Sequence, residues 1–248
     1  MVEFVYQSDI GQKRTKNEDS CGYFINQKGL ALALVADGLG AYQAGEIASK
    51  NAVSHLGEKF EKTDFETTSQ ATVWLEKQTE IENQDLLLQA SQNQDLTGMA
   101  TTLVGALILP DEIIVANLGD SRCYLLRDNQ ITQLTEDHSF VNELVKRGEI
   151  SKEEAKTHPN KNLIMRTLGV DEKAHLDIKF LEGQAQDILL LCTDGLTNMV
   201  DDQEISTILS SDTPLEAKAK ELVRQANQAG GLDNITVLLC RLDKEVTA

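Results

Sequence analysis

The sequence predicts an α+β fold in which a central antiparallel β-sandwich lies between pairs of α-helices. Helical patterns occur in pairs, at 44–60 with 64–91 and at 201–209 with 214–229, and do not alternate one for one with strands. One-for-one alternation would predict a doubly wound parallel sheet, so paired helices favour antiparallel sheets with helices outside them. The chain has 248 residues, 41% of them hydrophobic, which is enough for one large domain spanning 1–248.

The strands are predicted from short apolar or alternating runs that are bounded by turn residues. Tight turns at 118–120 and 128–129 join strands in the middle of the chain, so these neighbours should be antiparallel. The predicted strands are 3–8, 20–25, 30–36, 101–109, 112–117, 121–127, 130–134, 176–181, 188–193 and 234–241.

The four long helices are predicted from apolar residues that recur at helical spacing. In 44–60 the recurring apolar residues are Ile47, Ala48, Ala52, Val53, Leu56 and Phe60. Two shorter helices are predicted at 139–147 and 151–158, because Ser139 and Ser151 can cap their first turns and Glu154 completes a capping-box pattern. Both lie in a polar, loop-rich segment at about 139–169.

Composition excludes several classes of protein. The chain carries 23 Lys and Arg against 40 Asp and Glu, a formal charge of −17, so it should bind neither nucleic acid nor an anionic membrane surface. No apolar run approaches the ~18 residues of a membrane helix. Four cysteines without a Cys-x-x-Cys pair predict buried thiols in a reducing compartment, which favours a cytoplasmic location. The four histidines show no zinc-binding spacing, and we expect them to be surface or capping residues.

Three carboxylates stand beside glycines at the ends of predicted strands. Asp37-Gly38 and Asp194-Gly195 each follow an apolar run, and Asp233 follows a glycine turn and precedes the last strand. A single Asp-Gly pair after a strand is usually only a turn. If the fold brings the three carboxylates together, they repel one another unless a cation lies between them, and a hard divalent cation prefers oxygen ligands. The pattern therefore indicates a metal site.

Seven short motifs, each weak alone, follow one another in order along nearly the whole chain. They are 14–19, 35–38, 98–102, 117–122, 135–139, 191–196 and 231–234. Together they resemble the metal-dependent Ser/Thr protein phosphatases of type 2C, in their compact bacterial form. The resemblance implies a single phosphatase domain built as a β-sandwich between two pairs of helices, in agreement with the fold predicted above.

By the same resemblance, two Mn²⁺ or Mg²⁺ ions would be held by the side chains of Asp37, Asp194 and Asp233 and by the carbonyl of Gly38. Two further acidic residues, Glu18 and Asp19, would hold metal-bound waters. A hydroxide bridging the two ions would attack phosphorus directly, and no phosphoenzyme would form.

Three further assignments complete the predicted site. Arg14 resembles the family's contact with the substrate phosphate, for which a planar guanidinium is well suited. Asp120, with Asp194, resembles the ligands of a third, weaker ion, although a turn Asp at this position could also serve only the backbone. We further expect 139–169 to be a flap beside the active site that contacts phosphoproteins.

The sequence departs from the family pattern at one position. Bacterial members usually read Asp-Gly-Met-Gly-Gly-His, whereas this chain has Leu39 after Asp37-Gly38 and Tyr42 where the histidine would stand. A serine alkoxide needs a proton to leave, and either a metal-bound water or the Tyr42 phenol would have to supply it.

We expect a cytoplasmic, monomeric enzyme that dephosphorylates Ser and Thr in signalling proteins, acting opposite a Ser/Thr kinase. Two alternatives remain open from the sequence. The first is a pseudoenzyme that binds phosphoproteins without turnover, which the missing histidine favours and the intact acids oppose. The second is a phosphodiesterase for small nucleotides, which lacks support because no aromatic residues for base stacking lie near the acids.

Overall fold

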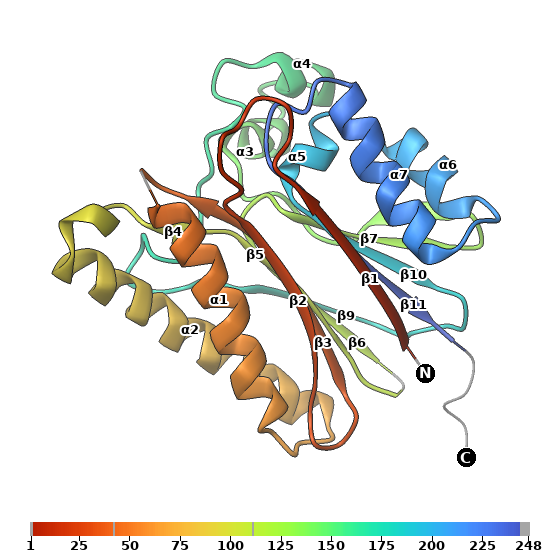
Figure 1. Ribbon diagram of the computed structural model, residues 1–248, viewed down its shortest axis with the longest axis horizontal. Helices are drawn as coiled ribbons and strands as arrows, with labels where there is room; N and C mark the ends of the chain where they lie inside the picture. The colour runs from red at the N-terminus through yellow and green to blue at the C-terminus, as the bar shows by residue number, and fades with distance from the viewer. Residues whose placement is uncertain (1, 42, 111, 244–248) are drawn as a thin grey trace.

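Two antiparallel β-sheets stack at the centre of the computed structural model (Figure 1), which describes residues 2–41, 43–110 and 112–243. One sheet has the strand order β1 (Val2–Asp9), β11 (Ile235–Leu242), β10 (Ile188–Cys192), β7 (Arg122–Arg127) and β8 (Gln130–Gln133). The other has the order β2 (Asp19–Ile25), β3 (Ala31–Leu39), β5 (Leu103–Ile108), β6 (Ile113–Leu118) and β9 (Asp177–Leu181), with the short β4 (Ala100–Thr101) paired to β3. We call these the β1 sheet and the β2 sheet.

Helices cover the outer face of each sheet (Figure 1). On the β2 sheet lie α1 (Ala44–Glu61) and α2 (Thr68–Gln92), followed by the single 3-10 turn η1 (Gln94–Leu96). On the β1 sheet lie α5 (Asp194–Thr197), α6 (Asp202–Ser210) and α7 (Leu215–Gln228). The predicted fold class, a β-sandwich between pairs of helices, is therefore confirmed.

Strand β3 shows how the layers share the core. Its side chains point alternately to the two faces of the sheet, as the pleat requires. Leu32 and Leu34 pack in the cluster that includes α1 and α2, whereas Ala33 and Val35 pack in the cluster between the two sheets. Because both faces are covered, every residue from 31 to 36 is buried, and the strand appears in the sequence as an unbroken apolar run.

The predicted elements match the observed ones to within a few residues, with three corrections. The strand predicted at 101–109 is two strands, β4 and β5, separated by Thr102. The strand predicted at 30–36 continues to Leu39, so Asp37 and Gly38 lie within β3 and not after it. Asp194 is the first residue of a four-residue helix, α5, that no sequence pattern predicted.

The segment predicted as a flap contains α3 (Phe140–Lys146) and α4 (Lys152–Thr157), which lie in the upper part of Figure 1, as α5 does. Both predicted serine caps are confirmed: Ser139 caps α3, and Ser151 forms a capping box with Glu154 at α4. The two ends of the segment meet at its base, where the N–H of Phe140 donates to the carbonyl of Leu163 at 2.8 Å.

All four cysteines are free thiols, and Cys123, Cys192 and Cys240 are buried as predicted, while Cys21 is only partly buried. Among the described residues, no helix combines the length and the apolar character that crossing a membrane would need.

Candidate metal centre

The predicted acidic ligands gather at one end of the sandwich. Asp19, the first residue of β2, is the register partner of Asp37 in β3. Side chains of directly opposed residues in an antiparallel pair lie on the same face, so the two carboxylates are neighbours. The charges of Asp120, Asp194 and Asp233 also raise the pKa of Asp37. These three acids lie in the turn between β6 and β7, at the start of α5 and just before β11. The structure thus brings the predicted acids together.

The backbone of Asp37 is held by two consecutive threonines. The Asp37 N–H donates to Thr102 Oγ1 at 2.9 Å, and the Asp37 carbonyl accepts from the Thr102 N–H and from Thr101 Oγ1, both at 2.9 Å. Thr102 keeps the register in which β4 and β5 both pair with β3, but its hydroxyl, and not its carbonyl, accepts the Asp37 N–H, and the strand is interrupted at this residue. These bonds fix the point from which the Asp37 carboxylate projects.

Gly38 permits the close approach of α1 to the acids. A Cβ atom here would lie 2.1 Å from the carbonyl oxygen of Gly45 in α1 and 2.6 Å from that of Glu18. Real Cβ atoms do not come this close to backbone oxygens, so a side chain at position 38 would displace either α1 or the Glu18 segment. Position 38 therefore requires glycine for close packing against α1 and Glu18, independently of any ligand that the Gly38 carbonyl binds.

Asp194 and Asp233 are placed by a second close approach. A Cβ atom at Gly195 would lie 1.9 Å from the carbonyl oxygen of Asn234, so the first turn of α5 packs directly on the turn before β11. Asn234 joins this turn to the 10–18 loop: its Nδ2 donates to the carbonyls of Ile10 and Lys16 at 3.0 and 2.8 Å, and its Oδ1 accepts from the Glu18 N–H at 2.8 Å.

Three carboxylate oxygens of the cluster have no hydrogen-bond partner among the described residues. They are Oδ1 of Asp19, Oδ1 of Asp120 and Oδ1 of Asp194, and all three are buried. The other oxygen is bound in two cases: Asp19 Oδ2 accepts from Thr193 Oγ1 at 2.9 Å, and Asp194 Oδ2 accepts from Asn198 Nδ2 at 2.8 Å. A buried carboxylate oxygen without a donor is costly, and a bound cation would satisfy it.

The same crowding raises the pKa of the acids. Burial raises the pKa of Asp194 to about 6, that of Asp19 to about 7 and that of Asp120 to about 8, and neighbouring carboxylates add to each shift. The pKa of Asp37 is raised well above its ordinary value by burial, followed by Asp19, Asp194, Asp120 and Asp233. Without a cation the cluster therefore tends to hold protons near neutral pH, and a divalent ion would compete with them.

Arg14 and Glu18 lie at the edge of the cluster. Arg14 Nη2 donates to Asp233 Oδ2 at 2.7 Å, and the arginine side chain is 49% exposed, so part of the guanidinium is open to a ligand from solvent. Burial raises the pKa of Glu18, and Arg14 opposes this shift. The predicted phosphate contact thus lies beside the predicted metal ligands.

The donor set fits a hard divalent cation, because it consists of carboxylate oxygens and one backbone carbonyl. Over 2–41, 43–110 and 112–243, however, no three His, Cys, Asp or Glu side chains already form a complete metal-binding group. The individual ligand assignments therefore stay predictions. Tyr42, the predicted proton donor, lies outside the described residues.

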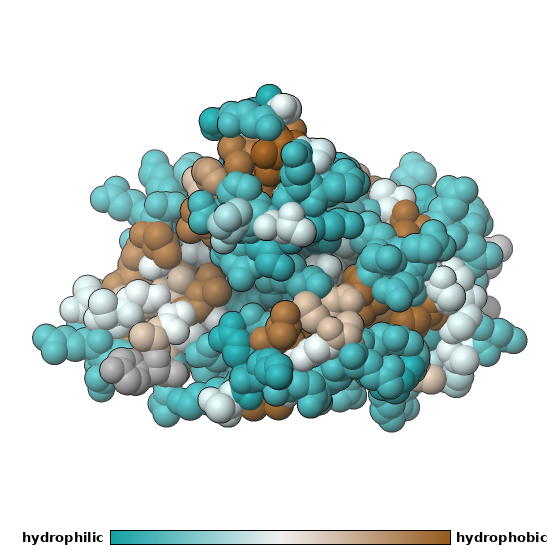
Figure 2. Space-filling model, turned by 90° about the horizontal axis from the view of Figure 1, so that it is seen from above, coloured by the Kyte–Doolittle hydropathy of each residue, from teal (hydrophilic) through white to brown (hydrophobic). Residues whose placement is uncertain are grey.

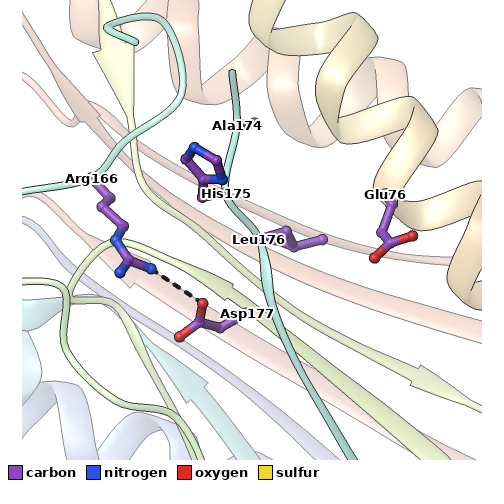
Figure 3. Close-up of a pocket in the computed structure, with 6 residues that line it drawn as sticks. All are labelled: Glu76, Arg166, Ala174, His175, Leu176 and Asp177. Atoms are coloured by element: carbon purple, nitrogen blue, oxygen red, sulfur yellow. Dashed lines mark hydrogen bonds and ion pairs between the residues drawn. The ribbon is translucent and has the colours of Figure 1, made fainter. Parts of the chain in front are cut away.

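Polar residues surround this end of the molecule. Figure 2, which views it from above, shows a face that is mainly hydrophilic, with smaller apolar groups between. A separate pocket of about 630 Å³ is lined by Glu76 of α2, by Arg166 and by residues 174–177 at the start of β9 (Figure 3). None of the predicted metal ligands lines that pocket.

The sequence missed several residues that hold the site. Thr101, Thr102 and Thr193 stand within the seven motifs without a predicted role, and their position beside the acids was the available signal. The expectation for the histidines is wrong for His138, which is buried and bonded on both ring nitrogens. An isolated histidine gives no periodic pattern from which its burial could be predicted.

Comparison with known proteins identifies the family. The model of the family "Protein phosphatase 2C" matches residues 10–240. The chain is 46% identical to the serine/threonine phosphatase stp of Listeria welshimeri over 235 residues, which cover 94% of this chain and 93% of that protein.

Solved structures agree. The serine/threonine phosphatase of S. agalactiae superimposes with a TM-score of 0.95 at 39% identity, covering 98% of this chain and all of the other. The catalytic domain of the serine threonine protein phosphatase PstP, solved with two manganese ions, gives a TM-score of 0.82 at 34% identity, covering 98% and 99% of the two chains. The resemblance is thereby confirmed: the chain belongs to the protein phosphatase 2C family and is a Ser/Thr protein phosphatase.

Proposed function

We propose that this enzyme hydrolyses phosphoserine and phosphothreonine in proteins with two Mn²⁺ or Mg²⁺ ions in the acidic cluster, without a phosphoenzyme. The observation that carries the proposal is the set of buried carboxylate oxygens of Asp19, Asp120 and Asp194 that lack partners in the described protein. Proteins rarely leave several such atoms together unless something else binds them. The two manganese ions of PstP, a relative with the same fold, support this choice of ligand.

Asp37, Asp194, Asp233 and the Gly38 carbonyl would hold the two ions, and Glu18 and Asp19 would hold waters around them. When bound, the ions would offset the charge of the phosphoryl group and acidify the attacking water. The chain's own contribution is rigidity: threonines 101 and 102 fix the backbone of Asp37, and Asn234 fixes the turn that carries Asp233. A preorganised site loses less free energy to rearrangement during the reaction.

Arg14 would bind the phosphate of the substrate. Its guanidinium is anchored by one bond to Asp233 and is about half exposed, so other N–H groups can reach a phosphate oxygen. This arrangement places a positive charge beside the acids of the cluster. Arg14 would thereby offset the repulsion that the net charge of −17 imposes on a phosphorylated substrate.

Asp120 and Asp194 would hold a third, weaker ion. Each has a buried oxygen without a partner among the described residues, and burial and then the charge of Asp194 raise the pKa of Asp120. The position where many relatives carry a histidine falls at Tyr42, outside the described residues, and Leu39 cannot donate a proton. A third ion is the alternative source of the acidity that a serine leaving group needs.

We also propose that 1–248 act as one catalytic domain, with 139–169 as a flap that contacts phosphoproteins. The flap carries the exposed apolar side chains of Leu163 and Met165, which could pack on a protein partner. It also carries Lys146, Arg147, Lys152, Lys156, Lys161 and Arg166. Shortening this segment should change kinetics on phosphoproteins more than on a small aryl phosphate, and equal effects on both would contradict the flap role.

Phosphoproteins, among them a Ser/Thr kinase and its substrates, would be the partners of a monomeric enzyme, and the four free thiols support a cytoplasmic location. The activity is tested with phosphopeptides that differ only in carrying pSer, pThr or pTyr, with Mn²⁺ and then with excess chelator. We expect turnover of pSer and pThr that the chelator abolishes. Full turnover in chelator would contradict the metal-dependent mechanism, and binding of phosphopeptides without hydrolysis would indicate a pseudoenzyme.

A further inference from the structure

A buried histidine from another part of the chain, His138, binds the turn that carries Asp120, where Asn117 Nδ2 also donates to the Gly119 carbonyl at 3.3 Å. The N–H of Gly119 donates to His138 Nδ1 at 3.1 Å, and the carbonyl of Gly119 accepts from the backbone N–H of His138 at 2.9 Å. The two peptide groups on either side of Gly119 are thus both bound by His138. The peptide group that follows Gly119 contains the nitrogen of Asp120, so the orientation of Asp120 depends on the bonds that His138 makes.

Gly119 also sets the distance between this turn and Asp37. Its φ of +123° favours glycine, and a Cβ atom here would lie 2.6 Å from Cβ of Thr102. Thr102 in turn bonds to the backbone of Asp37, and its hydroxyl is 2.7 Å from that of Ser121. A shift of Gly119 would therefore change the place of Asp120 relative to Asp37.

The far side of the imidazole is bound by an acid on β9. His138 Nδ1 accepts from a backbone N–H, so the neutral ring carries its proton on Nε2, and Nε2 donates to Asp177 Oδ2 at 3.0 Å. Asp177 Oδ1 also accepts from Arg166 Nη1 at 3.2 Å, and Figure 3 shows these two side chains pointing towards each other in the lining of the pocket. The His138 side chain is 6% exposed and that of Asp177 is 55% exposed.

We propose that His138 is a positioning residue for Asp120, which it holds through the Gly119 peptide groups while Asp177 fixes its tautomer. A partner for the outer ring nitrogen commonly sets the orientation of a histidine in this way. The inference rests on the proposed function only in that Asp120 is taken as a metal ligand. The placement of the turn is a property of the protein itself, and it can be measured without metal.

A pair of matched variants separates the two bonds of the ring. In His138→Asn the side-chain oxygen can replace Nδ1 as acceptor for the Gly119 N–H, but nothing replaces Nε2. In His138→Gln the amide reaches towards Asp177 and leaves the Gly119 N–H without its acceptor. Amide hydrogen exchange of Gly119 in the metal-free protein, followed by NMR, should be accelerated about 10-fold in His138→Gln and stay near the parent value in His138→Asn.

Kinetics on a phosphoserine peptide with Mn²⁺ give the second readout. We expect kcat to fall about 10-fold or more in His138→Gln with little change in KM, and His138→Asn to restore most of it. Equal exchange rates and equal kcat values in the two variants would overturn the proposal, because His138 would then only fill space. Faster exchange in His138→Gln with unchanged kcat would uphold the placement by His138 and overturn the role proposed for Asp120.

Asp177 provides a variant that should fold in any case, because its side chain is mostly exposed. Asp177→Ala removes the outer partner of the ring, and Asp177→Asn keeps an acceptor for Nε2–H. We expect Asp177→Ala to accelerate Gly119 exchange by a smaller factor than His138→Gln, about 3-fold, and Asp177→Asn to behave as the parent. Identical exchange in Asp177→Ala and the parent would contradict the part assigned to Asp177.

Discussion

Strand β10 has an aspartate near each end, and the two aspartates differ in the hydrogen-bond partners of their carboxylate oxygens. Asp187, directly before the strand, is 1% exposed and fully partnered: Arg127 donates to its two oxygens at 2.9 and 2.6 Å, and the Gln184 N–H donates at 2.8 Å. Asp194, two residues after the strand, has a bond from Asn198 to Oδ2, while its buried Oδ1 has no partner among the described residues.

This difference separates a structural acid from a candidate ligand. A buried carboxylate is stable when donors within the protein surround it, as Arg127 and Gln184 do for Asp187. At the other end of the strand the neighbours of Asp194 are further acids, including Asp233 and Asp37. Burial alone therefore does not identify a metal site. The absence of a protein donor in the described region, next to like charges, is the more specific sign.

The largest expected effect is on kcat, and it should differ between alanine substitutions at Asp194 and at Asp187. Asp194→Ala, and equally Asp233→Ala, should fold and lose at least about 100-fold in kcat on a phosphoserine peptide with Mn²⁺, since each removes a proposed metal ligand. Asp187→Ala should keep kcat within about 2-fold per folded molecule. Full turnover by Asp194→Ala at saturating Mn²⁺ would contradict the ligand assignment.

Asp120 should have an intermediate effect that depends on the leaving group. We expect Asp120→Ala to fold, to keep the two tightly held ions and to lose about 10- to 100-fold in kcat on a phosphoserine peptide. The loss should be smaller on an aryl phosphate, because a phenolate leaves without being protonated. An unchanged rate on the peptide would leave Asp120 as an ordinary turn residue.

Asparagine substitutions at Asp194 and at Asp187 should change the free energy of unfolding in opposite directions. In metal-free protein, Asp194→Asn should raise the free energy of unfolding by about 1 kcal/mol, because one charge leaves a repulsive cluster. Asp187→Asn should lower it by about 1–3 kcal/mol, because Arg127 loses its charged partner. Thermal unfolding followed by circular dichroism measures the Tm of both variants. A change of the same sign in both would contradict the distinction between a structural acid at Asp187 and a metal ligand at Asp194.

The last comparison concerns the effect of pH on stability. The fold raises the pKa of Asp194, Asp19 and Asp120 to about 6, 7 and 8, above the ordinary value near 4 of an unfolded Asp. Carboxyls of this kind contribute stability at pH below 4, and the contribution is lost as pH rises through 6–8. The Tm of metal-free protein should therefore fall by several degrees between pH 5 and pH 8. Saturating Mn²⁺ should reduce this fall, and an identical fall with and without Mn²⁺ would contradict the account.

Local patterns predicted most of the fold and singled out Asp37, Asp194 and Asp233, which the structure brings together. The unbroken apolar run of β3 and the spacing in 44–60 are signals that neighbouring residues create together. The pairing of Arg127 with Asp187 joins residues 60 positions apart, and α5 is too short to show a helical period. The burial of His138 depends on contacts with Gly119 and Asp177, which only the assembled sheets bring near. These features are set by tertiary structure, so the sequence alone could not predict them.

The central claim is that the acids at the end of β10 form the metal site, and anomalous diffraction tests it most directly. Crystals of the parent grown with Mn²⁺ would be measured above and below the manganese absorption edge. We predict two strong anomalous peaks among the oxygens of Asp37, Gly38, Asp194 and Asp233, and a weaker third peak near Asp120. Anomalous peaks only elsewhere, for example in the pocket beside Arg166 and Asp177, or none within the acidic cluster at saturating Mn²⁺, would contradict the account.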